Sequence, residues 1–258
     1  MSKRSPDVRL MDAPMFLAGP LPAAAKQCEA VMAAHRHRFV PADRRHLVTA
    51  FFRAESLALF ALREAAECLP DIYRIPLIEQ AADEERHVDF FAEWLDTRPM
   101  VPRPRARARQ IPQRLATLLV NEITGFLQFC TLKSLCGEPG RRDAIEGMAR
   151  DELRHIGRLI RWMKTFEGER VMKPVSGSVD RFCRAMSERL RQFFPRAALS
   201  PLVDALILPH IRPIRTLFGF DEFGPEVDDG SARDPWYPLG DGGPFSLCPR
   251  SGDEHGSR

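Results

Sequence analysis

Long apolar runs and familiar cofactor motifs are both missing from this sequence. No apolar stretch reaches the roughly 20 residues that span a bilayer, so we expect no transmembrane segment. No apolar signal core follows residues 1–7, which predicts a cytoplasmic rather than a secreted protein. Flavin, nicotinamide and iron–sulfur motifs are also absent, so any redox reaction needs electrons from another molecule.

The sequence is also poor in cysteine pairs and in net charge. Its six cysteines include no Cys-x-x-Cys, which indicates reduced, buried thiols. A formal charge of +3 is too small to indicate nucleic-acid binding by itself. The composition, 44% hydrophobic and 28% charged, is typical of a globular domain, which we place at residues 1–220. Glycine, proline and aspartate dominate residues 221–258, where we expect a poorly ordered tail.

Two copies of one short motif, Asp-Glu-x-Arg-His, are present in the sequence. Glu84 and Glu152 are the glutamates of these copies. A lone glutamate in an apolar, helix-like stretch precedes each of them: Glu55 lies 29 residues before Glu84, and Glu122 lies 30 before Glu152. Two unrelated charged helix faces are the alternative interpretation. Four glutamates and two histidines in this order are the ligand set of a carboxylate-bridged di-iron or di-manganese centre in a four-helix bundle.

The spacing of these glutamates agrees with two antiparallel helical hairpins. The midpoint of the first pair falls at Leu69 and Pro70, where the proline should end one helix and begin the next. The midpoint of the second pair falls at Gly137, inside a turn rich in glycine and proline. Each hairpin then brings its lone glutamate level with its Glu-x-x-His, whose two side chains share one helix face.

The segment between the two hairpins is rich in proline and arginine. The prolines between Arg98 and Pro112 exclude a helix and favour an extended path of about 3.1 Å per residue. Some 14 residues then cover roughly 43 Å, enough to run beside a helix of about 26 residues. The segment therefore predicts the long crossover of a ferritin-like bundle. A Pro/Arg-rich linker between two domains is the alternative.

The expected architecture is all-α. The metal-binding bundle should occupy residues 43–167, with the first helix running from about Pro41 to Cys68. Extra flanking helices are expected over about 21–39 and 178–218. We expect the last of these to be interrupted by its two internal prolines, Pro209 and Pro213.

The predicted ligands favour one kind of metal chemistry. Carboxylates with one imidazole per metal suit iron(II) or manganese(II) and leave positions open for dioxygen. A bound imidazole normally donates its other N–H to an acceptor, so we expect Asp83 to orient His155 and Asp151 to orient His87. The arginine of each motif would then neutralise these aspartates in a dry interior; ordinary surface salt bridges are the alternative. These arginines are Arg86 and Arg154.

The double motif resembles that of the ferritin-like di-iron carboxylate superfamily, whose oxygen-activating members often carry Asp-Glu-x-Arg-His. The likeness covers about residues 43–167 and rests on the motif alone. It implies a ferritin-like four-helix bundle that holds two iron ions, with manganese as an alternative. The iron ligands that the resemblance implies are Glu55, Glu84, His87, Glu122, Glu152 and His155.

Residues near the motifs differ from those of several members of the superfamily. Phe91 stands where radical-generating ribonucleotide reductase subunits keep a tyrosine. Met148 replaces the extra histidine ligand of arylamine N-oxygenases, and Phe126 replaces the threonine of methane-type hydroxylases. The cysteine-rich iron site of rubrerythrins is absent. Small quinone hydroxylases and tRNA-modifying hydroxylases remain open.

Bulky apolar side chains are expected to line the metal centre and shield a reactive intermediate from water, although such residues are more often plain core. The predicted lining residues are Phe51, Leu59, Phe91, Phe126, Met148 and Ile156. Gly125, one turn after Glu122, would leave space for a substrate. Gln80 should face either the centre or solvent. His210 stands between prolines and has no partner at ligand spacing.

We therefore expect a di-iron oxygenase of the monooxygenase or hydroxylase type. It would use dioxygen to oxidise a small organic substrate, with a ferredoxin or a reductase as external electron donor. A tRNA-base hydroxylase is the first alternative, in which the arginines from Arg103 to Arg109 contact RNA phosphates. Iron handling, as a ferroxidase or a peroxidase, is the second.

Overall fold

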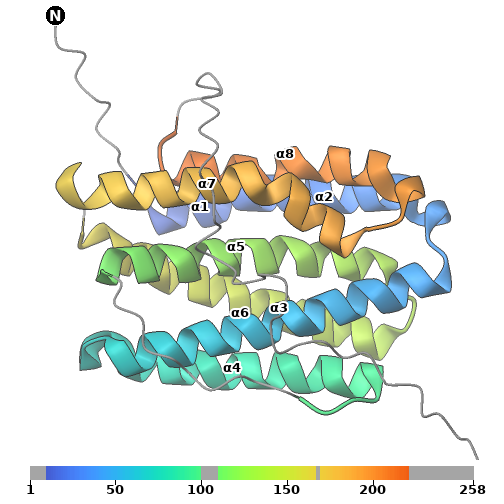
Figure 1. Ribbon diagram of the computed structural model, residues 1–258, viewed down its shortest axis with the longest axis horizontal. Coiled ribbons are helices and arrows are strands. Elements are labelled where there is room, and N and C mark those ends of the chain that lie inside the picture. Colours follow the sequence, from blue (N-terminus) through green and yellow to red (C-terminus); the bar gives the residue numbers. More distant parts are fainter. Residues whose placement is uncertain (1–9, 100–109, 167–168, 221–258) are drawn as a thin grey trace, which may run out of the picture. The chain divides into compact units, whose positions relative to one another are not determined.

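The computed structural model describes residues 10–99, 110–166 and 169–220, and all regular structure within these ranges is helical (Figure 1). The prediction of an all-α architecture is therefore confirmed for this part of the chain. The α-helices are α1 (Ala13–Ala18), α2 (Pro20–His35), α3 (Pro41–Cys68), α4 (Asp71–Leu95), α5 (Ile111–Leu135), α6 (Pro139–Lys164), α7 (Glu169–Phe193) and α8 (Ser200–Leu217).

Helices α3 to α6 form a group of four. Helix α3 packs against α4 and α5, and α6 packs against the same two helices from the other side. Helices α4 and α5 run in the same direction (Figure 1), which is the arrangement that a long connection between them requires. Residues 100–109 of that connection lie outside the described residues.

The boundaries of the two hairpins follow local chain chemistry. Helix α3 has Pro41 in its first turn, and the Asp43 carboxylate accepts a hydrogen bond from the Val40 amide at 2.9 Å. Helix α3 ends one residue before Leu69, and α4 begins directly after Pro70. Gly137 lies between α5 and α6. Both predicted turns are therefore confirmed, and each hairpin places its two glutamates at similar heights.

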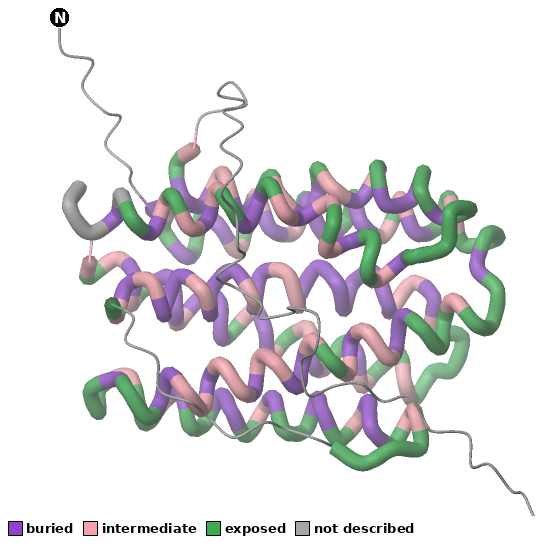
Figure 2. The backbone as a smooth tube through the Cα atoms, viewed as in Figure 1, coloured by how far each residue is buried: buried purple, intermediate pink, exposed green. Residues whose placement is uncertain are grey.

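The expectation that no apolar segment reaches membrane-spanning length is wrong for helix α5. Its 25 residues include an 18-residue window with a mean hydropathy of 1.4, long and apolar enough to cross a bilayer. However, 78% of that window is buried within the protein, because α2, α3, α6, α7 and α8 all pack against this helix (Figure 2). A helix that is apolar over most of its surface is expected where neighbours cover most of that surface.

The flanking helices differ in three ways from the sequence-based expectation. Short helix α1 was not predicted. Helix α7 begins at Glu169 instead of residue 178 and continues through Pro174, because Met172, Val175 and Val179 pack into the core at helical spacing. Helix α8 also continues through its two internal prolines, so the predicted interruption there is wrong. The predicted tail over 221–258 lies outside the described residues.

Candidate metal centre

The six predicted ligands lie together between helices α3, α4, α5 and α6. The lone glutamates come from α3 and α5, and the two Glu-x-x-His pairs come from α4 and α6. No residue among them is more than 3% exposed. Burying four carboxylates in one place is strongly unfavourable unless cations or protons neutralise them. These residues are Glu55, Glu84, His87, Glu122, Glu152 and His155.

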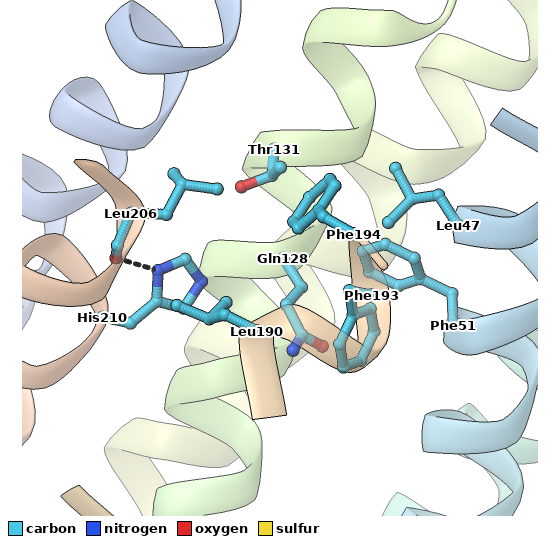
Figure 3. Close-up of a pocket in the computed structure, with 9 residues that line it drawn as sticks. All are labelled: Leu47, Phe51, Gln128, Thr131, Leu190, Phe193, Phe194, Leu206 and His210. Carbon is cyan, nitrogen blue, oxygen red and sulfur yellow. Dashed lines mark hydrogen bonds between the residues drawn. The ribbon is translucent and has the colours of Figure 1, made fainter. Parts of the chain in front are cut away.

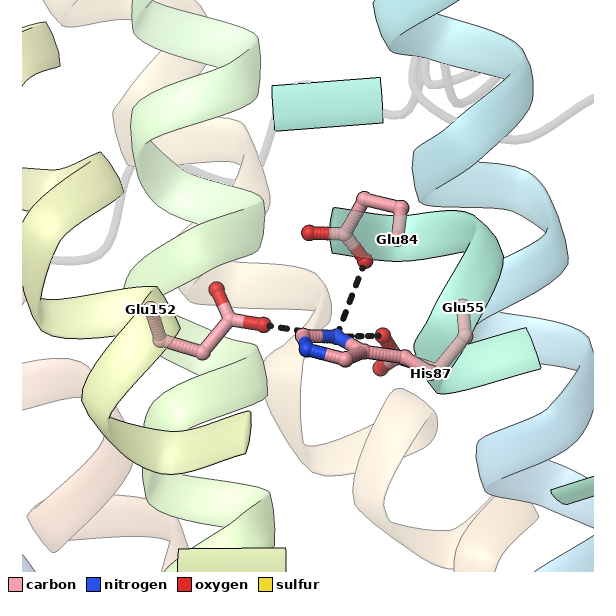
Figure 4. Close-up of side chains that lie close together, drawn as sticks. All are labelled: Glu55, Glu84, His87 and Glu152. Atoms are coloured by element: carbon pink, nitrogen blue, oxygen red, sulfur yellow. Dashed lines mark hydrogen bonds and ion pairs between the residues drawn. The ribbon is translucent and has the colours of Figure 1, made fainter. Parts of the chain in front are cut away.

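The six side chains form two overlapping groups, each able to hold a metal ion. Four of them, Glu55, Glu84, His87 and Glu152, bring one ligand atom each within 4.8 Å of the others (Figure 4). The second group combines Glu84 and Glu152 with Glu122 and His155 under the same limit. Glu84 and Glu152 thus belong to both groups, as bridging carboxylates do.

The two oxygens of each shared carboxylate face different histidines. Glu84 Oε2 lies 3.4 Å from His87 Nδ1, and Glu84 Oε1 lies 3.6 Å from His155 Nδ1. Glu152 Oε1 lies 3.7 Å from His87 Nδ1, and Glu152 Oε2 lies 4.0 Å from His155 Nδ1. A carboxylate that presents one oxygen to each of two sites can bridge two metal ions. The site therefore has approximate twofold symmetry.

The unshared glutamates each belong to one side of the site. Glu55 Oε2 lies 3.3 Å from His87 Nδ1, and Glu122 Oε2 lies 3.0 Å from His155 Nδ1. These separations are within the roughly 4.2 Å that divides two ligand atoms bound about 2.1 Å from one metal ion on opposite sides. Small side-chain shifts are enough for all six groups to bind.

The electrostatics of the site fit a pair of divalent cations. Both carboxylate oxygens of Glu84 are buried and have no hydrogen-bond partner, which is unusual for a buried polar group. Burial, and then the charges of Glu122 and Glu55, raise the pKa of Glu84 well above its ordinary value although His87 opposes this. Burial and the charges of Glu122 and Glu84 raise the pKa of Glu152 in the same way. Two divalent cations balance the charge of four carboxylates.

Both expected crossed contacts behind the histidines are present. Asp83 Oδ2 lies 2.9 Å from His155 Nε2, and Asp151 Oδ2 lies 3.4 Å from His87 Nε2. An ionised carboxylate can only accept a hydrogen bond, so each Nε2 carries the donated proton. With that proton fixed on Nε2, the lone pair of each Nδ1 would be available to a metal ion held by the carboxylate cluster.

The arginines paired with the two aspartates are not in the dry interior that we had expected. Asp83 pairs with Arg86 at 2.5 Å, and Asp151 pairs with Arg154 at 2.6 Å, but both arginine side chains are more than half exposed. These ion pairs therefore lie at the protein surface and not in a dry interior. Hydrogen bonds from His155 and Arg86 outweigh burial and hold the pKa of Asp83 below its ordinary value.

All six side chains that were predicted to line the centre are buried; they are Phe51, Leu59, Phe91, Phe126, Met148 and Ile156. Aromatic stacking links two of these residues to His87, one of the six predicted metal ligands. Phe51 stacks on Phe91 and on Phe129, and the Phe129 ring forms a T-shaped pair with the His87 imidazole, with ring centroids 5.6 Å apart. A Cβ atom on Gly125 would lie 3.6 Å from the Glu152 carboxylate, so this glycine borders the site.

Two buried polar residues have surroundings that the sequence did not predict. Gln80 is fully buried, and its Nε2 donates a hydrogen bond of 2.8 Å to Glu122 Oε1. The other is His210, which is 1% exposed, and burial lowers its pKa to about 4. Its Nδ1–H donates to the Leu206 carbonyl at 2.9 Å, and its Nε2 has no hydrogen-bond partner. Gln80 stands about one helical turn before Glu84, whereas no spacing rule connects His210 with the motifs.

His210 and Phe51 both line a small cavity (Figure 3). The cavity has a volume of about 10 Å³, close to the space that one water molecule needs. Gln128 and Thr131 of α5 supply its other polar side chains, and phenylalanine and leucine side chains form the rest of its wall. Phe51 therefore belongs both to the wall of this cavity and to the ring stack beside His87.

Comparison of the chain with protein-family models, with curated proteins and with solved structures gave no match.

Proposed function

We propose that the chain is a ferritin-like di-iron oxygenase that oxidises a small organic substrate. The observation that carries this proposal is the overlap of the two ligand groups, which share Glu84 and Glu152. The parallel run of α4 and α5, with one ligand-bearing hairpin on each side of the connection, supports a ferritin-like bundle. Iron(II) and manganese(II) both suit a set of carboxylates and imidazoles, and iron is the metal that we propose.

The protein's own residues prepare the site for this chemistry. A pair of iron ions, when bound, supplies the capacity to activate dioxygen. Asp83 and Asp151 hold the imidazoles in the tautomer that exposes Nδ1, and Gln80 holds the Glu122 carboxylate in position. Buried phenylalanines, among them Phe51 and Phe91, exclude water from the neighbourhood of His87.

The proposed reaction needs an external electron donor. No flavin or nicotinamide motif is present in the sequence, so we propose that a ferredoxin or a reductase delivers the electrons. The tRNA-base hydroxylase alternative depends on Arg103 to Arg109, which lie outside the described residues. It predicts salt-sensitive binding of RNA, with an affinity that falls steeply between 50 and 200 mM salt.

Oxygen consumption distinguishes an oxygenase from an iron-handling protein. The reduced, iron-loaded protein is mixed with dioxygen, first alone, then with a panel of small organic compounds, and then with excess ferrous iron. We expect slow consumption by the protein alone and at least tenfold faster consumption with a true substrate, with one oxidised product per dioxygen. Rapid turnover of excess ferrous iron, without a response to any organic compound, would identify a ferroxidase instead.

A further inference from the structure

A second site lies at the end of the four-helix group where α3 and α6 begin and α4 and α5 end, the right-hand end in Figure 1. There the four helix ends enclose a groove with a volume of about 390 Å³. This volume is within the range of small-molecule sites, roughly 300–1,000 Å³. The lining residues are Pro41, Arg44, Arg45, Val48, Trp94, Leu95, Leu135, Cys136, Gly137, Glu138 and Arg141.

The charges in this end groove favour an anion. Three arginines line it against a single glutamate, Glu138, so the lining carries a net charge of +2. Arg141 Nε lies 3.2 Å from Glu138, so the single carboxylate of the lining is already paired with an arginine. Arg44 and Arg45 are exposed and form no ion pair with any residue that the structure describes. Their guanidinium groups are free to bind a carboxylate or a phosphate in a two-pronged manner.

The remaining lining of the end groove is apolar and includes an aromatic platform. Trp94 is half-buried, and the Arg141 guanidinium lies over its ring at 4.8 Å from the centroid. Val48 and the buried Leu135 supply aliphatic surface beside it. An apolar surface next to unpaired guanidinium groups matches a molecule with an apolar or aromatic body and one acidic group.

We propose that the end groove binds a small organic anion with an aromatic or apolar body. Arg44, Arg45 and Arg141 bind the acidic group, and Trp94 packs against the body. This inference does not depend on the proposed oxygenase activity, because it concerns binding alone. The groove nevertheless lies close to the metal centre: Val48 and Trp94 are each seven residues, about two helical turns, from Glu55 and His87.

Calorimetric titration of the full chain with 2-naphthoate, and with its neutral counterpart 2-naphthamide, tests the proposal. We expect the acid to bind at least tenfold more tightly than the amide, and its affinity to fall as salt is added. Equal affinity for the two compounds would overturn the proposal. Tighter competition by a short RNA than by free naphthoate would assign the groove to nucleic acid and also overturn it.

Substitutions locate the bound acid within the groove. Arg44→Gln and Arg141→Gln should each weaken naphthoate binding about tenfold, whereas Arg141→Lys, which keeps the charge, should weaken it less. Arg161→Gln is the matched control, because Arg161 is an exposed arginine on α6 outside the groove. Naphthoate should also quench tryptophan fluorescence in the wild type but not in Trp94→Phe. Unchanged affinity in Arg44→Gln and Arg141→Gln would contradict the proposal.

Discussion

At the scale of single residues, Asp151 lies between two partners. Its carboxylate lies 3.4 Å from His87 Nε2 on one side and 2.6 Å from Arg154 on the other. We expect Asp151→Asn to weaken metal binding by about 10- to 100-fold, the usual effect of losing a hydrogen-bond partner behind a ligand. Equilibrium dialysis against iron(II) or manganese(II) measures this. A wild-type affinity in Asp151→Asn would show that His87 needs no charged acceptor at Nε2.

His210 gives the protein a pH-dependent stability that does not involve the metal centre. Its pKa in the folded protein is about 4, below the ordinary 6.5, so the unfolded chain binds a proton more readily between these values. The stabilising contribution is complete above pH 6.5 and decreases as pH falls toward 4. We expect the free energy of unfolding to drop by about 3 kcal/mol across this window from His210 alone. The measurement is chemical denaturation at several pH values, with His210→Leu as the comparison. Parallel pH profiles for the two proteins would contradict this prediction.

The buried Glu/His cluster that could hold a metal was predictable from the sequence, whereas the buried His210 was not. Glu84 and His87 are three residues apart, and Glu152 and His155 repeat that spacing. This repeated spacing alone was enough to predict that the four side chains lie together. The burial of His210 depends on the packing of α2, α7 and α8, which no local pattern records. The exposure of Arg154 likewise depends on how far its helix lies from the surface of the protein.

At the scale of elements, α5 contributes both a ligand and the space beside it. Gly125 lies one turn after Glu122, and a Cβ atom there would be in ordinary contact with Glu152. Gly125→Ala should therefore be tolerated, because a contact of 3.6 Å to the carboxylate carbon needs no rearrangement. Gly125→Leu should displace the Glu152 carboxylate and weaken metal binding at least tenfold. Metal titration of the two variants, with circular dichroism as a check on folding, decides this. Equal affinities in both would show that the space beside Glu152 has no role.

The hairpins were predictable as elements, but the last helix was not. Pro70 and Gly137 stand at turns where local chain chemistry and tertiary structure agree. Pro209 and Pro213 predict an interruption because each removes a backbone donor. Helix α8 continues through both, and both rings are buried in its packing against α2 and α7. Tertiary packing thus outweighs the loss of backbone hydrogen bonds, and a single sequence does not reveal this.

At the scale of the whole molecule, we expect metal binding and folding to be coupled. The carboxylate cluster combines side chains from four helices, so bound ions would hold both hairpins together. Each ion present at about 100 times its dissociation constant adds roughly 2.7 kcal/mol of stability. Two ions should therefore raise the melting temperature by about 10 °C or more in a domain of this size. Differential scanning calorimetry with and without manganese(II) tests this coupling. An unchanged melting temperature at saturating metal would contradict it.

The most direct test of the whole account is the number of divalent ions bound per chain. Because Glu84 and Glu152 belong to both ligand groups, the account predicts two iron(II) or manganese(II) ions per chain in the wild type. It predicts about one in Glu55→Ala, which removes a ligand from one group only, and close to none in the Glu84→Ala/Glu152→Ala double variant. Full metal content in the folded double variant would contradict the assignment of a dinuclear centre.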